Sequence, residues 1–85
     1  MTGEKMLRRA GKLVASRRAV YGDPASSMAT VAARWSLTLG QQITPAQVAL
    51  CLIDLKLLRL AHNPMHLDSI LDVAGYAAVL REVTR

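Results

Sequence analysis

Apolar residues recur every three or four positions in four separate segments of the chain, which is the spacing of helices that pack through one face. The four expected helices cover about residues 5–18, 24–39, 45–61 and 67–83. No segment alternates apolar and polar residues in the manner of a strand. The pattern therefore predicts an all-α fold, a small bundle of about four helices.

Residues that start and stop helices separate these segments. Asp23-Pro24 places a capping side chain and then a proline at the start of the second helix, and Gly40 is a typical stop after it. Thr44-Pro45-Ala46-Gln47 has the spacing of a capping box at the start of the third helix. These signals support one domain over residues 1–85, with no internal repeat.

The chain carries more apolar material than a domain of its size easily buries. Hydrophobic residues make up 52% of only 85 residues, and the segment 45–61 is apolar around most of its circumference. Such a helix belongs at the centre of a bundle or at a subunit interface. We therefore expect a homo-oligomer, with a dimer favoured, in which a second copy completes the bundle.

The net charge of +5 lies wholly in the first helix. Residues 1–18 hold six cations against Glu4, whereas residues 19–85 are neutral, so the chain divides into a basic amphipathic helix (1–20) and a neutral apolar core (21–85). The candidate polyanion-binding residues are Lys5, Arg8, Arg9, Lys12, Arg17 and Arg18. Three interpretations stay open for this face: ordinary solvation, contact with nucleic acid or another polyanion, and contact with a membrane surface.

Bulk features narrow the compartment and the partners. No stretch approaches the roughly 18 apolar residues of a membrane span, so no membrane insertion is expected. Cys51 is the only cysteine and no secretory signal is seen, which favours the cytoplasm of a host cell. Aromatic residues total 4%, which gives little support to base stacking.

Charged groups interrupt the two apolar helices. Asp68, Asp72 and Tyr76 share one face at a spacing of four residues, and we expect Lys56 or Arg59 to form an ion pair with Asp72 or Asp68. The network either sets helix register or lines a polar pocket. The candidate pocket residues are Tyr21, Asp23, Asp54, Lys56, Arg59, His66, Asp68, Asp72 and Tyr76.

Signals for catalysis and for metal binding are weak. No nucleophile arrangement or phosphate-binding glycine loop is present, so no catalytic residue is assigned. Asp68 and Asp72 are the only candidates for a Mg²⁺ site, and no cofactor is otherwise expected. His62 and His66 flank Pro64, which favours capping or packing of a turn over zinc binding.

Three motifs occur in order along the chain: Tyr21-Gly22-Asp23-Pro24, Lys56-x-x-Arg59-Leu60 and His66-x-Asp68-Ser69-x-x-Asp72-x-x-Gly75-Tyr76. Together they resemble a family of small phage and prophage proteins carried as a domain of unknown function, in a match that spans about residues 17–78. The resemblance implies a helical fold and an association with phages, without an assigned chemistry.

A more distant similarity connects the chain to nucleotide-modification-associated domains and to MazG-like all-α pyrophosphohydrolases. The latter family implies helical dimers and Mg²⁺ held by an ExxE pair, which this sequence lacks. Three hypotheses follow. The favoured one is a non-enzymatic binding protein that acts on nucleic acid, a nucleotide or a host defence protein. The alternatives are a reduced Mg²⁺-dependent nucleotide pyrophosphohydrolase and a structural subunit of a phage particle or packaging machine.

Overall fold

Four α-helices joined by short turns make up the molecule. The computed structural model describes residues 1–85, with α1 (Gly3–Tyr21), α2 (Pro24–Leu39), α3 (Pro45–His62) and α4 (Leu67–Thr84). No strand is present, so the predicted all-α fold of about four helices is confirmed. None of the four helices combines the length and the apolar character that crossing a membrane requires.

The helix ends follow the local signals of the sequence. Thr2 caps α1 by accepting a hydrogen bond from the backbone N–H three residues later (3.3 Å). The predicted capping box starts α3, because the Gln47 N–H donates to Thr44 Oγ1 (3.1 Å) and the Thr44 N–H donates to the Gln47 side-chain oxygen (2.9 Å). Gly22 and Gly40 follow α1 and α2 with φ of 85° and 69°, a conformation that favours glycine.

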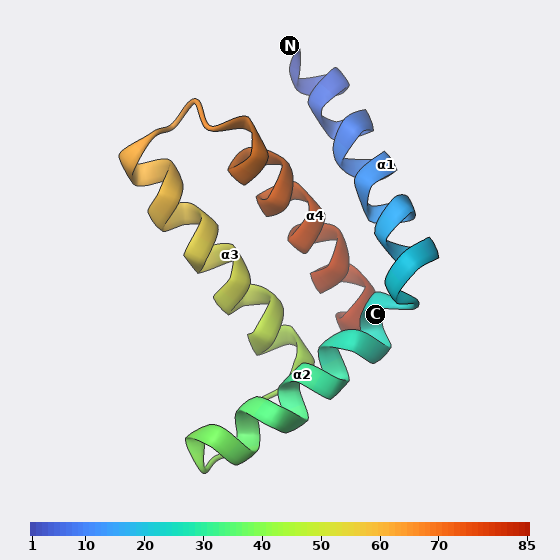
Figure 1. Ribbon diagram of the computed structural model, residues 1–85, viewed down its shortest axis with the longest axis vertical. Helices are drawn as coiled ribbons and strands as arrows, with labels where there is room; N and C mark the ends of the chain where they lie inside the picture. The colour runs from blue at the N-terminus through green and yellow to red at the C-terminus, as the bar shows by residue number, and fades with distance from the viewer.

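The helices form an open arrangement around α4. Figure 1 shows α3, α4 and α1 side by side, with α3 antiparallel to α4 and α2 crossing the end where α3 begins. α4 packs against all three other helices, whereas α1 and α3 make no close contact with each other. α1 packs against α4 at Gly75, which faces Val14 of α1. The apolar helix α3 therefore lies at an edge of the layer, and α4 holds the centre.

The core of a single chain is small. Only 6 of the 85 residues are buried, namely Ala10, Ala32, Val48, Ala49, Ser69 and Leu71. Several large apolar side chains stay exposed, among them Leu50, Leu57 and Leu58 of α3. The three-helix layer has only α2 across one end. The apolar surplus expected from the composition is thus left uncovered in one chain.

Candidate functional site

An ion-pair network centred on Asp72 joins the three helices of the layer. Lys56 Nζ of α3 lies 3.1 Å from Asp72 Oδ2 of α4, and a guanidinium nitrogen of Arg17 on α1 lies 3.5 Å from Asp72 Oδ1. The side chains of Lys56 and Asp72 are 13% and 18% exposed, so water screens this pair only weakly. The predicted pairing of Lys56 or Arg59 with a carboxylate of the last helix is confirmed for Lys56 and Asp72.

Arg17 is a member of this network that the charge pattern grouped instead with the polyanion candidates. It follows Ala10 and Leu13 by seven and four residues, which places it beside the packed stripe of α1. That spacing is the signal from which its inward role can be inferred. The choice of Asp72 as its partner depends on how α1 and α4 align, which no local pattern specifies.

His66 and Asp23 lie at helix N-termini. His66 is the N-cap of α4, where its Nδ1 accepts from the Ser69 N–H (3.3 Å) and lies 2.7 Å from Ser69 Oγ. The expectation that the histidines cap or pack the turn is therefore confirmed for His66. Asp23 is the N-cap of α2, and its Oδ2 accepts from the hydroxyl of Ser26 (3.4 Å). The Asp23 side chain accepts no backbone N–H of α2, so the capping hydrogen bond predicted there is absent, whereas the His66 side chain caps α4.

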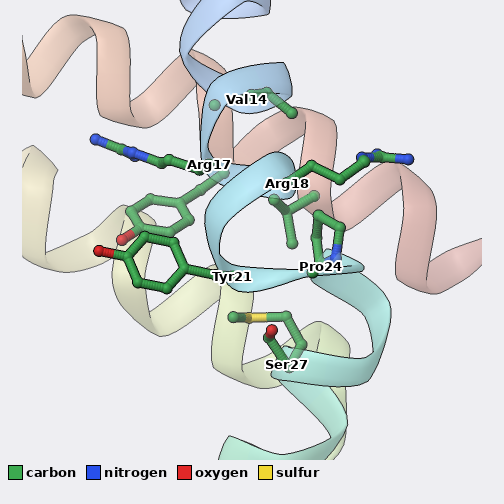
Figure 2. A pocket seen from close by; sticks show the side chains of 11 residues that line it. Val14, Arg17, Arg18, Tyr21, Pro24 and Ser27 are labelled. Carbon is green, nitrogen blue, oxygen red and sulfur yellow. The ribbon is translucent and has the colours of Figure 1, made fainter.

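A cleft of about 350 Å³ brings Tyr21 and Tyr76 together where α1 ends, α2 begins and α4 passes. Apolar side chains such as Val14 line much of the remaining wall. Figure 2 shows the side chains of Arg17 and Tyr21 extending to the same side of α1, with Arg18 on the other side. The volume of the cleft is at the lower end of the range for small-molecule sites.

Both arginines of this cleft are already paired with carboxylates of α4. Arg17 contacts Asp72, and Arg18 forms an ion pair and a hydrogen bond with Glu82. An anionic ligand would have to compete with these carboxylates for the guanidinium groups. The cleft is therefore better suited to a small apolar or aromatic group, with the hydroxyls of Tyr21, Tyr76 and Ser27 as polar contacts.

A second, shallower hollow of about 250 Å³ lies between α1 and the start of α4. Asp68 and Asp72 line it together with Arg9 and Arg17. The two carboxylates suggested as Mg²⁺ ligands thus share one hollow, as their spacing of four residues predicts. Two guanidinium groups line the same hollow, and like charge makes it a less favourable place for a divalent cation.

Asp54 and Arg59 lie apart from this hollow. Both are exposed on α3, and neither forms an ion pair. The chain brings together no group of three or more histidine, cysteine, aspartate or glutamate side chains that could hold a metal ion. The geometry therefore adds no support to the pyrophosphohydrolase hypothesis, in which Asp54 would assist Asp68 and Asp72.

The cations of α1 fall into a group that forms ion pairs with α4 and a group that forms none. Arg17 and Arg18, in the last turns of α1, pair with α4, whereas the exposed residues Lys5, Arg8, Arg9 and Lys12 form no ion pair. Figure 1 shows the first turns of α1 extending past the start of α4. The candidate polyanion surface with free cations is therefore the N-terminal half of α1, which we call the α1 basic surface (Lys5, Arg8, Arg9 and Lys12).

Comparison with known proteins places the chain among phage-associated sequences. Residues 5–84 match the family described as "Domain of unknown function (DUF6378)". The chain is also similar to the Gene 55 protein of Mycobacterium phage L5, with 38% identity over 64 residues. That alignment covers 74% of this chain and 41% of the relative, so the chain matches less than half of the relative's length. No solved structure matches the chain.

These findings confirm the resemblance to a phage-associated domain without an assigned function. The distant similarity to nucleotide-modification-associated and MazG-like domains stays a prediction, as do the proposed partners. Because the family match extends over nearly the whole helical fold, the chain belongs to the family described as "Domain of unknown function (DUF6378)".

Proposed function

We propose that the chain is a phage-associated binding protein that works as a homo-oligomer and contacts nucleic acid through the α1 basic surface. The observation that carries this proposal is the separation of paired from unpaired cations along α1. Arg17 and Arg18 are engaged by Asp72 and Glu82, whereas the four cations of the α1 basic surface have no carboxylate partner. Four unpaired cations close together on one exposed helix face are typical of a polyanion-binding surface.

The dimensions of the surface suit a nucleic-acid backbone. Lys5 and Lys12 are seven residues apart, which corresponds to about 10 Å along a helix axis. About 10 Å of a DNA duplex carries roughly six phosphates, so each of the four cations has a phosphate within reach. No aromatic residue precedes Tyr21, so the surface has no ring on which a base could stack. We therefore propose contact with phosphates and little sequence preference.

Binding to a fluorescently labelled 20-base-pair duplex, measured by anisotropy at several salt concentrations, tests the proposal. If four phosphates are contacted, the logarithm of the association constant should fall with the logarithm of the salt concentration with a slope of about −3.6 per protomer. No binding at about 50 mM salt would refute the nucleic-acid partner, because electrostatic contact is strongest there.

A pair of matched double variants locates the surface. Arg8→Gln with Arg9→Gln should reduce the magnitude of the slope by about 2 and weaken binding about tenfold or more. Arg34→Gln with Arg59→Gln removes the same net charge from exposed, unpaired positions on α2 and α3, and should change binding much less. Equal losses in the two variants would show that net charge, rather than the α1 basic surface, drives binding.

A further inference from the structure

The outward face of α3 carries an apolar stripe that no part of the chain covers. We define the α3 stripe as Leu50, Cys51, Asp54, Leu57, Leu58 and Ala61, all of which are exposed. Leu50, Leu57 and Leu58 are 48%, 49% and 59% exposed. Members of the stripe recur at spacings of three, four and seven residues, so they lie along one side of the helix. Such a spacing is typical of a helix that packs against another helix.

The size of the exposed surface matches what a partner of this chain would bury. A folded monomer of 9.2 kDa is expected to expose about 4,900 Å², whereas this chain exposes 5944 Å². The excess of about 1,000 Å² is close to the roughly 800 Å² that each partner contributes to a stable protein interface. The radius of gyration of 13.5 Å also exceeds the roughly 12 Å expected for a compact chain of this length.

We infer that the α3 stripe is the surface through which two copies of the chain associate about a two-fold axis. This inference rests on the proposal that the protein works as a homo-oligomer, and it names the surface used. In a two-fold dimer the same patch occurs on both partners, so the two α3 helices would pack with their stripes facing each other. The exposed stripe of one copy is then covered by the exposed stripe of the other.

The distribution of charge favours α3 over the other edge of the layer. α1 lies on the far side of α4 from α3, and its α1 basic surface holds four unpaired cations. Association through α1 would bring two such groups of like charge together, which is unfavourable. Association through the α3 stripe keeps the cationic helices at the outer edges, where both stay accessible to nucleic acid.

Asp54 is the only charged member of the α3 stripe, and it forms no ion pair. It lies midway between Leu50 and Leu58, so an antiparallel pairing centred on the stripe brings the two copies of Asp54 close together. Like charges at an interface oppose association. Asp54→Leu should therefore strengthen the dimer, whereas a charge introduced at the leucines should weaken it.

Sedimentation velocity over about 1–200 µM protein tests the inference with three variants and the wild type. Leu57→Asp with Leu58→Asp should raise the dimer dissociation constant about 100-fold or more, because each introduced charge must be desolvated. Asp54→Leu should lower it about tenfold. Leu37→Asp changes a leucine of α2 that is 85% exposed and lies off the stripe, and should leave association unchanged. Far-UV circular dichroism verifies that each variant keeps its helices.

The outcomes test the homo-oligomer and the α3 interface separately. A wild-type chain that sediments as a monomer throughout this range overturns both the homo-oligomer and the α3 interface. A wild-type dimer that persists in the Leu57→Asp, Leu58→Asp variant leaves the homo-oligomer standing and overturns the α3 stripe as its surface. A dimer that is weakened by the double variant and strengthened by Asp54→Leu supports the inference, because loss of folding cannot produce effects of opposite sign.

Discussion

Lys56→Met is the variant that most directly measures the ion pair at the centre of the helical layer. Methionine keeps much of the aliphatic stem and removes the ammonium group that lies 3.1 Å from Asp72. Exposed ion pairs contribute about 0–1 kcal/mol, and removing one partner of a fully buried pair costs about 3–5 kcal/mol. Because both side chains are shielded without being fully buried, we expect the free energy of unfolding to fall by about 2 kcal/mol.

Urea and thermal unfolding followed by circular dichroism at fixed protein concentration measure this loss. About 2 kcal/mol should lower the Tm of a domain of this size by roughly 8–16 °C. Arg17→Met is the matched control, because that side chain is 54% exposed and lies farther from Asp72, at 3.5 Å; its effect should stay below about 1 kcal/mol. Adding Asp72→Leu to Lys56→Met should recover much of the lost stability, since the shielded carboxylate that has lost its closer partner is then removed and Arg17, at 54% exposure, stays solvated.

Two results would contradict this role of the Lys56–Asp72 pair. If Lys56→Met and Arg17→Met destabilise the protein equally, the difference in shielding between the two contacts has no energetic weight. If the double variant is less stable than Lys56→Met alone, the cost of the single variant does not come from leaving Asp72 without its closer partner.

Three further substitutions test backbone conformation and helix capping by thermal unfolding. Gly11→Ala should stabilise the protein by up to about 1 kcal/mol, because residue 11 is helical and a Cβ there meets no atom within 4 Å. Gly40→Ala should destabilise the protein by about 1 kcal/mol, because its φ is 69°. Equal effects of the two substitutions would contradict the role of the backbone conformation. Thr44→Ala should lower the free energy of unfolding by about 1 kcal/mol, because it removes the hydroxyl oxygen that accepts a hydrogen bond from the Gln47 N–H. An unchanged Tm would show that the capping box is dispensable.

The helices themselves could be predicted from the sequence because their signals are local. The proline and threonine at the start of α3 and the glycines after α1 and α2 act within one turn of the residues that they affect. The Lys56–Asp72 pair was also predictable in kind, since a charge on an apolar helix needs an opposite charge nearby. The sequence did not specify Lys56 rather than Arg59, or Asp72 rather than Asp68, as the members of this pair, because that depends on how α3 and α4 align along their length.

The positions of α3 and α4 in the layer could not be derived from composition alone. The leucine-rich α3 is about as apolar as α4, yet α4 is central and α3 lies at an edge. α1 packs against α4 at Gly75, where a Cβ would lie 3.7 Å from Val14 Cγ2, so α4 contacts α1 as well as α3. Which helices pack together depends on the surfaces of both helices, and the apolar periodicity of one segment does not specify it.

The candidate site was likewise only partly predictable from the sequence. The cations of α1 were evident from their spacing, but their separation into paired and unpaired groups requires the partners Asp72 and Glu82, which are 55 and 64 residues away from them in the chain. The meeting of Tyr21 and Tyr76 in one cleft likewise depends on the packing of α1 against α4. Identification of the α1 basic surface as the free part of the helix therefore had to wait for the tertiary structure.

The reactivity of Cys51 in the unmodified protein tests the central claim most directly, because this residue is the only cysteine and lies exposed on the α3 stripe. The rate constant of its reaction with a small disulfide reagent is measured in excess reagent as the protein concentration rises from about 1 to 200 µM. Covering of the stripe by a second copy predicts that the rate constant falls several-fold over this range. A rate constant that stays at the value of a freely exposed thiol at every concentration would contradict the account.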